Sequence, residues 1–397
     1  MSVAKKVNNE HRTKNHSIRK NSGATRMREE RLKATIVIPT YNEAENIKVL
    51  LTRLSKALDA YLDRREYEII IVDDNSPDGT ASVAEETGEN LGLSSNLKVI
   101  VRKKERGLST AVIEGIKHAR GEYIVVMDAD LQHPPEKVPE LLRELEKGSD
   151  IVIATRYRGG ADKGLGLFRK LVSFIAGLAA KLLLPQARLV SDPMTGFFGL
   201  RRKVVEDRLD SMNPKGFKVL LEILVKGNYD PKRISEVPYV FGKRMYGESK
   251  LGVKEIIDYL HHLLKLNDYR ILKFAMVGTT GIAVNEGLLY ATHYVLRLPL
   301  WVAGVISIET SILSNFTLNS IYTFRKVKTT VPLAKRVLRY HLATAAGVAT
   351  NYAVLLVLSY LLGVEPLIAN LIGIILGFIA NYTLSEHYVW QRIGGEP

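Results

Sequence analysis

Four apolar stretches follow one another in the last third of the sequence, and they constrain the fold more than any other feature. They span residues 271–296, 300–324, 340–362 and 367–389. Each stretch is long enough for a helix that crosses the ~30 Å hydrocarbon core of a bilayer. A soluble protein can bury one such helix, but four in succession predict a membrane domain with four transmembrane helices.

The four stretches form a tandem duplication in which each repeat contains two spans. A shift of 66 positions aligns the repeats without a gap and matches Gly281 with Gly347, Ala283 with Ala349, Asn285 with Asn351, Tyr294 with Tyr360, Ala303 with Ala369, Asn315 with Asn381, Thr317 with Thr383 and Tyr322 with Tyr388. Because each repeat has an even number of spans, both repeats insert into the membrane in the same orientation. We expect residues 268–392 to form one membrane domain.

Basic residues gather in the loop between the second and third spans, which contains no acidic residue. They are Arg325, Lys326, Lys328, Lys335, Arg336 and Arg339. The other two loops carry only Arg297 and Glu365. Basic loops favour the cytoplasmic side of a membrane. We therefore expect a multi-pass protein of the cell membrane whose N-terminal domain and C-terminus are cytoplasmic.

A basic segment, residues 1–33, opens the chain and contains ten Lys or Arg against three Glu, which gives +7 of the total net charge of +14. The segment lacks apolar periodicity, which is typical of disorder. Attraction to anionic lipid headgroups is favoured over nucleic-acid binding, and a role in solubility alone stays open. The sequence has no cysteine, which excludes disulfides and thiolate chemistry. No secretory signal is expected, since the first apolar run, Ala34–Thr40, has the length of a strand.

Residues 34–252 alternate short apolar strands with helices. The expected strands are 34–38, 67–72, 96–102, 123–127 and 150–154, and the expected helices are 46–58, 108–119 and 135–147. This alternation predicts an α/β domain with a mostly parallel sheet and helices on both faces. Ligands of such sheets bind beyond the carboxyl ends of the strands, so the candidate site residues are expected there.

Polar residues follow three of the expected strands. The segments are 39–43 (Pro-Thr-Tyr-Asn-Glu), 73–76 (Asp-Asp-Asn-Ser) and 128–133 (Asp-Ala-Asp-Leu-Gln-His). No glycine-rich dinucleotide fingerprint and no Walker sequence accompanies them, which excludes Rossmann and P-loop interpretations.

An Asp-x-Asp-x-Gln pattern follows the central strand. If the chain stays extended there, Asp128, Asp130 and Gln132 project to one side. Three oxygen ligands suit a hard divalent cation such as Mg²⁺ or Mn²⁺. Two carboxylates also leave coordination positions open for a diphosphate.

In combination these motifs resemble family 2 glycosyltransferases of the GT-A fold, and specifically the dolichyl-phosphate (polyprenyl-phosphate) mannosyltransferases. The matching segments are 39–46, 73–80, 128–136, 154–157, 192–198 and 247–251. The resemblance covers about residues 34–255. The four-span region looks like the GtrA-like domain that is fused to archaeal members of this family, and residues 1–33 have no counterpart.

The resemblance implies roles for individual residues. The donor nucleotide would contact Pro39, Tyr41, Glu43, Val72, Asp74, Asp128, Ala129, Asp130, Arg244 and Lys250. The metal ligands would be Asp128, Asp130 and Gln132. Arg156, Arg169 and Ser173 would bind the acceptor phosphate, and Asp130, Arg156 and Arg169 would be the catalytic residues. Lys243 and Tyr246 depart from the pattern of the family beside Arg244.

The implied reaction transfers mannose from GDP-mannose to dolichyl phosphate and gives dolichyl β-D-mannosyl phosphate. A polyprenyl phosphate is already anionic near neutral pH, so it needs no general base. We expect an in-line displacement, with inversion, that depends on electrostatic stabilisation of the leaving diphosphate. Asp192 is the alternative candidate for a base, against a structural role at the turn before Pro193.

Two stretches, 168–184 and 253–267, combine apolar and basic residues at helical spacing. They are expected to lie on the membrane surface as interfacial helices, with ordinary core-facing helices as the alternative. Two other functions remain open: glucosyl transfer from UDP-glucose, and translocation of a lipid-linked sugar by the membrane half. No obligate protein partner is expected.

Overall fold

The computed structural model describes residues 32–157, 161–162, 167–212, 218–242 and 252–391. All but the last two residues of the expected basic segment 1–33 lie outside these ranges.

A seven-stranded sheet forms the centre of the N-terminal domain, with the strand order β3-β2-β1-β4-β7-β5-β8. The strands are β1 (Ala34–Thr40), β2 (Tyr67–Asp73), β3 (Leu97–Val101), β4 (Tyr123–Val126), β5 (Ile151–Thr155), β7 (Phe198–Arg201) and β8 (Ile234–Pro238). Only β7 is antiparallel to its neighbours. The expected, mostly parallel sheet is confirmed. A separate two-stranded sheet pairs β6 (Ala161–Asp162) with β9 (Val240–Phe241).

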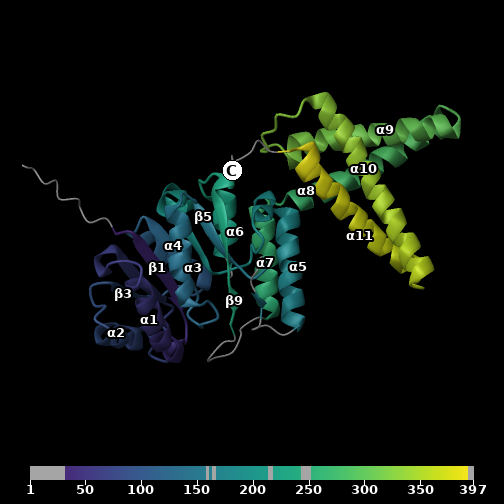
Figure 1. Ribbon diagram of the computed structural model, residues 1–397. Helices are drawn as coiled ribbons and strands as arrows, with labels where there is room; N and C mark the ends of the chain where they lie inside the picture. The colour runs from purple at the N-terminus through teal and green to yellow at the C-terminus, as the bar shows by residue number, and fades with distance from the viewer. Residues whose placement is uncertain (1–31, 158–160, 163–166, 213–217, 243–251, 392–397) are drawn as a thin grey trace, which may run out of the picture.

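Helices cover both faces of the large sheet, as the alternation of strands and helices predicts (Figure 1). One face packs against α1 (Ala44–Asp59), α2 (Thr80–Asn90) and α4 (Val138–Glu146). The other packs against α3 (Leu108–His118) and α6 (Val219–Lys226). Short 3-10 helices lie in the connections: Arg64–Glu66, Pro135–Lys137, Pro185–Leu189, Arg202–Val204, Glu206–Ser211 and Pro231–Arg233.

Two helical hairpins form the C-terminal domain, and each of their four helices ends in a π-helical turn. The first hairpin contains α8 (Arg270–Leu289) with η7 (Tyr290–Val295) and α9 (Leu300–Leu318) with η8 (Asn319–Thr323). The second hairpin contains α10 (Leu333–Leu356) with η9 (Val357–Leu361) and α11 (Pro366–Leu384) with η10 (Ser385–Val389). By length and composition, three of these helices could cross a membrane: Leu300–Thr323, Leu333–Leu361 and Pro366–Val389. The first expected span, 271–296, is a helix but is not among these three, so its crossing stays a prediction.

The structure repeats with the same shift of 66 positions as the sequence. The turns η8 and η10 occupy equivalent positions. A Cβ atom on Gly281 would fall within 3 Å of the Asn315 side chain, and one on Gly347 would lie 3.0 Å from Cβ of Asn381. Each asparagine therefore packs against a glycine of the preceding helix, a position where only a small residue lets the two helices approach.

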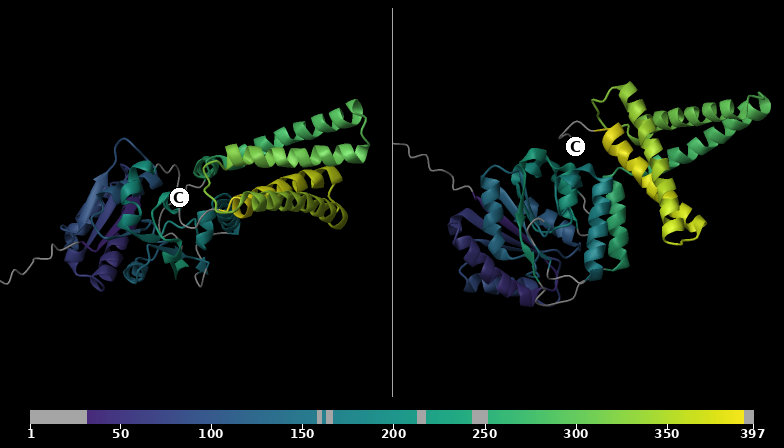
Figure 2. Two further views of the ribbon diagram at one scale, coloured as in Figure 1. Left: turned by 90° about the horizontal axis from the view of Figure 1, so that it is seen from above. Right: turned by 45° about the vertical axis from the view of Figure 1, so that its right-hand side comes forward.

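The hairpins contact each other next to the N-terminal domain and diverge towards their far ends (Figures 1 and 2). An aromatic cluster joins them there, in which the Trp390 ring stacks on Phe324 at 4.2 Å between centroids and also faces Phe316. A hydrogen bond of 3.1 Å between His341 of α10 and Glu309 of α9 adds a polar contact between the hairpins. A carboxylate within a span usually pairs inside the helix bundle, as Glu309 does here with His341.

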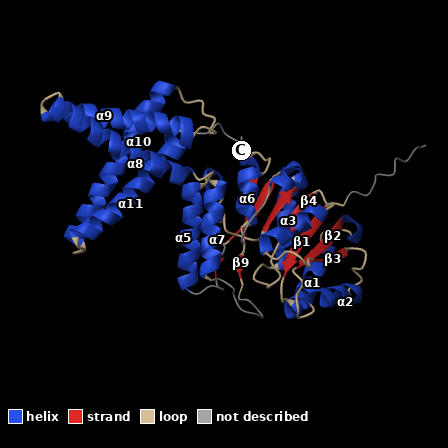
Figure 3. Cartoon of the chain, turned by 180° about the vertical axis from the view of Figure 1, so that it is seen from behind, coloured by secondary structure: helices blue, strands red, loops and turns tan. Residues whose placement is uncertain are grey.

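The helices α5 (Leu167–Leu183) and α7 (Val253–Leu266) lie side by side between the sheet and the membrane domain (Figure 3). They cover the two stretches expected as interfacial helices. The hydroxyl group of Tyr259 on α7 donates a 2.6 Å hydrogen bond to the carbonyl oxygen of Ala176 on α5. Asn267, directly after α7, binds both the Leu183 carbonyl oxygen and the Tyr382 hydroxyl of α11. The pair of helices thus connects the two domains.

Candidate active site

Parallel pairing brings the polar segments after β1, β2 and β4 to one edge of the sheet. Pro39 pairs with Val72, and Thr40 with Asp73. The Asp73 carboxylate accepts hydrogen bonds from the hydroxyl groups of Thr40 (2.9 Å) and Ser76 (2.6 Å). It thereby holds the end of β1 and the turn after β2 together. Two of the expected nucleotide contacts, Pro39 and Val72, are buried in the strands themselves.

Tyr41 and Glu43 lie half-buried at the rim of this edge. The backbone N–H of Glu43 donates to the Thr80 hydroxyl at 3.0 Å, and its carboxylate accepts a hydrogen bond from Asn46. The guanidinium of Arg106 lies 5.2 Å from the centroid of the Tyr41 ring. Tyr41 therefore presents an aromatic face beside a cation, an arrangement suited to a nucleoside.

Asp74 is buried in an ion pair with Arg102, which is not among the expected site residues. Nε of Arg102 lies 2.7 Å from the Asp74 carboxylate, and the side chains are 8% and 7% exposed. The same carboxylate accepts the backbone N–H of Gly107 at 2.7 Å. Asp74 thus fixes the loop from Arg102 to Gly107 against the end of β2. The position of Arg102 at the end of an expected strand was the signal that could have identified it.

The Asp-x-Asp-x-Gln segment bends rather than continuing as a strand, which corrects the expected geometry. β4 ends at Val126, and Leu131 adopts a left-handed conformation with φ of 63°. The bend lets the Asp130 carboxylate accept the backbone N–H of Gln132 at 3.1 Å. Strand alternation is therefore the wrong reason for grouping these side chains, because a local turn sets their positions.

Asp128 is held by neighbours from two other segments. Its backbone N–H donates to Nδ1 of His133 at 3.1 Å, so this nitrogen of the buried ring carries no proton. The His133 ring stacks on Phe197 at 5.2 Å and contacts Tyr239 and Phe241 edge-on. A Cβ on Gly196 would lie 3.1 Å from a carboxylate oxygen of Asp128, so a larger residue there would push against this carboxylate, and glycine allows the close approach of the 192–198 segment.

The donor set of Asp128, Asp130 and Gln132 fits a divalent cation. The Asp128 side chain is 32% exposed and thus accessible from solvent. The amide nitrogen of Gln132 donates to the Gly242 carbonyl oxygen at 3.1 Å, which leaves the amide oxygen as the atom to ligate an ion. No cluster of three His, Asp or Glu side chains that could hold a metal occurs in the described part of the chain. Proteins usually hold Mg²⁺ with one or two carboxylates, and phosphate oxygens of the substrate complete the coordination.

Arg156, expected at the acceptor phosphate, is buried in an ion pair with Asp192. The Nε and Nη2 atoms lie 2.8 and 3.3 Å from the two carboxylate oxygens. Burial lowers the pKa of the guanidinium, but the Asp192 charge and hydrogen bonds outweigh it and raise the pKa above its usual value. Because Asp192 is fully buried and occupied by Arg156, this geometry favours a structural role for it over that of a base.

The segment after Asp192 connects the site to α5 and α7. Lys218, which is also not among the expected site residues, donates to the Met194 carbonyl oxygen at 2.8 Å. Desolvation lowers the pKa of its ammonium group, and the Asp192 charge opposes this shift. The Tyr259 hydroxyl of α7 lies 3.4 Å from the Met194 sulfur. The same short segment therefore makes three contacts. Met194 contacts α7, Gly196 approaches Asp128, and Asp192 pairs with Arg156.

The remaining expected site residues are only partly described. Ser173 is half-buried on α5, one helical turn after Arg169. Arg169 belongs to the same helix, but its side chain lies outside the described residues, as do Arg244 and Lys250. Ala129 is buried between the two aspartates of the bend.

Comparisons with known proteins agree with this architecture. The model of the glycosyl transferase family 2 matches residues 35–209, and that of the GtrA/DPMS transmembrane domain matches residues 273–390. A dolichol-phosphate mannosyltransferase of Pyrococcus furiosus is 44% identical over 365 residues, which is 90% of this chain and 99% of that protein. One of Saccharomyces cerevisiae is 43% identical over 58% of this chain and 86% of its own length.

Among solved structures, glucosyl-3-phosphoglycerate synthase of Mycobacterium tuberculosis is 20% identical over 59% of this chain and 81% of that chain, with a TM-score of 0.44. This similarity is too low to bear on fold or function. The family models confirm the expected GT-A domain followed by a GtrA-like membrane domain. The chain is therefore a glycosyltransferase of family 2 and belongs to the dolichol-phosphate mannosyltransferase family.

Proposed function

We propose that this protein transfers mannose from GDP-mannose to a polyprenyl phosphate such as dolichyl phosphate, with inversion and with help from Mg²⁺ or Mn²⁺. The observation that supports this most is the segment 192–198, which contacts Asp128 on one side and the helix α7 on the other. The proposed donor site, with its oxygen ligands, would thereby lie next to the two helices that we expect to face the lipid surface. The names of the relatives agree with the sugar and the acceptor, mannose and dolichol phosphate.

The reaction would need no proton transfer to activate the acceptor, since its phosphate is already anionic. An oxygen of that phosphate forms the new bond at the anomeric carbon while the bond to the donor diphosphate breaks and GDP leaves. A divalent cation on Asp128, Asp130 and Gln132 would supply charge neutralisation for the leaving diphosphate. Arg156, Arg169 and Ser173 would hold the acceptor phosphate, for which the planar guanidinium is suited. Asp192 would fix the orientation of Arg156.

The exposed faces of α5 and α7 support membrane contact at the acceptor side. Their inner faces pack together with the catalytic domain around Ala180, Leu221 and Leu263. Their outer faces expose large apolar residues: Leu171, Phe174, Ile175, Leu178, Ile256, Ile257 and Leu260. A stripe of this kind on neighbouring helices is typical of insertion at the headgroup level.

The catalytic domain and the basic loop lie on the same side of the membrane domain. Nζ of Lys326, in that loop, is 3.3 Å from the carboxylate of Asp268 at the end of the interfacial pair. By the positive-inside rule we assign both to the cytoplasm. GDP-mannose would then reach the site from the cytoplasm, and the lipid would reach it from the cytoplasmic leaflet.

Donor identity is tested by thermal unfolding of the detergent-purified protein with nucleotide sugars and Mn²⁺. We expect 1 mM GDP-mannose to raise the unfolding temperature by several degrees, because a ligand at about 100 times its Kd stabilises by about 2.7 kcal/mol. UDP-glucose at the same concentration should change it by less than about one degree. A larger shift with UDP-glucose would replace mannosyl transfer with glucosyl transfer as the function.

Membrane contact is tested by the double variant Phe174→Asp with Ile257→Asp, whose side chains are 61% and 60% exposed. Charges on the apolar face should oppose insertion. We expect transfer to a long polyprenyl phosphate in liposomes to fall about tenfold, the equivalent of about 1.4 kcal/mol. Transfer to a short, water-soluble prenyl phosphate should stay unchanged, and the matched variant Phe174→Leu with Ile257→Leu should behave like wild type. Equal losses on both acceptors would instead indicate two core-facing helices.

A further inference from the structure

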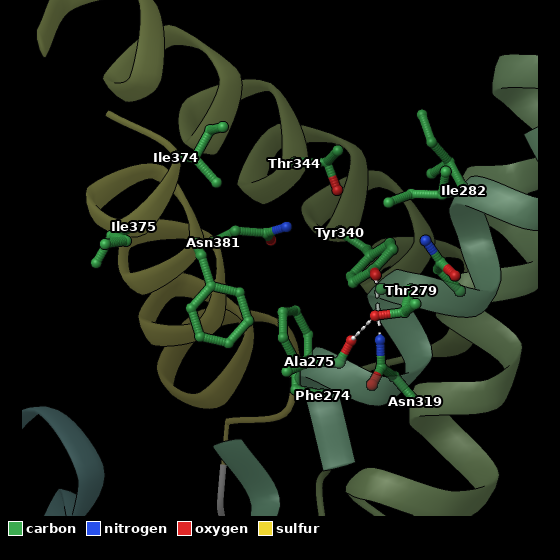
Figure 4. A pocket seen from close by; sticks show the side chains of 14 residues that line it. Phe274, Ala275, Thr279, Ile282, Asn319, Tyr340, Thr344, Ile374, Ile375 and Asn381 are labelled. Carbon is green, nitrogen blue, oxygen red and sulfur yellow. Dashed lines mark hydrogen bonds between the residues drawn. The ribbon is translucent and has the colours of Figure 1, made fainter. Parts of the chain in front are cut away.

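A cavity of about 420 Å³ lies in the membrane domain, between the two helical hairpins. Its volume is within the range of small-molecule binding sites. Figure 4 shows that side chains converge on it from both hairpins, with Thr344 and Asn381 on one side and Ile282 and Thr279 on the other. Among the expected catalytic and binding residues that the structure describes, none lines it, so it is separate from the described part of the candidate active site.

The cavity lies where the two repeats face each other. Four pairs of its lining residues are 66 positions apart: Phe274 with Tyr340, Gly278 with Thr344, Ile312 with Phe378 and Asn315 with Asn381. Equivalent positions of both repeats therefore contribute to one space. Transport proteins that are built from repeats bind their ligands at the interface between the repeats. An interface of this kind can therefore form a binding site within a membrane.

Polar atoms in this cavity lack partners among the described residues. Oδ1 of Asn315 and Oγ1 of Thr344 are buried without a hydrogen bond. The amide of Asn319, in contrast, already donates to the Tyr340 hydroxyl at 3.1 Å. A buried polar atom without a partner costs about 1–3 kcal/mol, so a rotation of either side chain that presents this atom to a ligand in the cavity would recover this energy.

The chemistry of the walls defines the kind of ligand. The described residues that line the cavity include no charged side chain, so none of them would offset the charge of a phosphate. Amide and hydroxyl groups both donate and accept hydrogen bonds, which matches the hydroxyl groups of a polyol. The isoleucine and phenylalanine side chains around them match an alkyl chain.

The depth of the polar groups also suits a lipid head. Asn315 and Asn381 each lie eight residues before the last residue of their helices, Thr323 and Val389. At 1.5 Å per residue this is roughly 12 Å from the end next to the catalytic domain. The amides are thus in the leaflet nearer that domain rather than at the far side.

We propose that this cavity between the repeats binds the uncharged polyol head of a lipid, in which sugar or glycerol hydroxyl groups meet Asn315, Asn381 and Thr344. The site differs from that of the phosphorylated acceptor, because it offers no cation. Its occupant is therefore a second lipid, bound whether or not mannosyl transfer is the reaction.

Two glycines of α8 provide a matched test. A Cβ atom on Gly278, which lines the cavity, would have no neighbour within 4 Å, and the same holds for Gly287, which does not line it. Leucine at position 278 should fill the cavity without a clash, and leucine at 287 should point elsewhere. Both changes replace glycine within a helix, so neither should weaken the helix itself.

The experiment measures binding by native mass spectrometry of the full-length chain from phosphatidylcholine nanodiscs. The probes are octyl mannoside, 1-monooctanoylglycerol and octyl phosphate, which share a chain length and differ in the head. We expect wild type to bind one or both polyol probes at least about tenfold more tightly than octyl phosphate, as two or three hydrogen bonds would give. Gly278→Leu should lose this binding by about tenfold or more, and Gly287→Leu should keep it.

The two polyol probes distinguish a sugar head from a glycerol head. The variants Asn315→Ala and Asn381→Ala should reduce the preference for a polyol over octyl phosphate. Equal binding by the Gly278→Leu variant would place the lipid elsewhere. A preference of wild type for octyl phosphate would overturn the proposal. Binding of none of the probes would also overturn it, because the cavity would then hold only water.

Discussion

The Asp130→Asn variant is expected to lose at least about 10³-fold in mannosyl transfer while it remains folded, a loss of about 4 kcal/mol in transition-state stabilisation. Asp130 is only 6% exposed, and its carboxylate accepts the backbone N–H of Gln132. Asparagine has the same shape and keeps an oxygen for that hydrogen bond, so the bend should persist. The substitution removes the negative charge that a divalent cation needs.

The measurement is transfer of labelled mannose from GDP-mannose to a polyprenyl phosphate, with unfolding temperature recorded on the same preparations. Asp207→Asn is the matched control, since Asp207 is exposed on a 3-10 helix far along the chain from the bend. A chelator should abolish wild-type transfer, and Mn²⁺ or Mg²⁺ should restore it. Full turnover of Asp130→Asn, or of wild type in the chelator, would contradict a cation site at this bend.

Periodicity sufficed to predict most of the sheet, because buried parallel strands such as β1 and β2 are short, continuous apolar runs. It did not reveal β7, the antiparallel strand between β4 and β5. Its residues, Phe198–Arg201, mix an aromatic residue, a glycine and a charge. Only pairing with strands distant in the sequence makes this segment a strand, and no local pattern carries that information.

Site residues that are recognisable by their type and their place after a strand could be predicted from the sequence. Site residues whose role depends on a contact with a distant segment could not. The acidic strand ends could be identified from their positions alone. The bend at Leu131 could not, since its left-handed conformation is unusual for a leucine and results from its surroundings. The partners Arg102 of Asp74 and Lys218 of the Met194 carbonyl are separated from them by 28 and 24 positions. Their roles become visible only when the chain is folded.

The Asp192→Ala variant is expected to lose about 3–5 kcal/mol of stability, because it leaves the buried guanidinium of Arg156 without the carboxylate that offsets its charge. The Arg156 and Asp192 side chains are 7% and 0% exposed, so water cannot replace the missing partner. The guanidinium also lies 5.2 Å from the centroid of the Phe241 ring, next to the His133 cluster. Asp192→Asn should lose less, because its amide oxygen still accepts a hydrogen bond.

The double variant Arg156→Met with Asp192→Leu separates the structural from the catalytic contribution of this pair. Apolar replacement of both members of a buried ion pair is often neutral for stability, so the unfolding temperature should return towards that of wild type. Transfer should stay low, because no guanidinium remains to hold the acceptor phosphate. If Asp192→Ala instead abolished transfer without any loss of stability, the carboxylate would have to act on the substrates directly. A loss of stability in Asp192→Ala that the double variant repairs is the result that assigns Asp192 a structural role as the partner of Arg156.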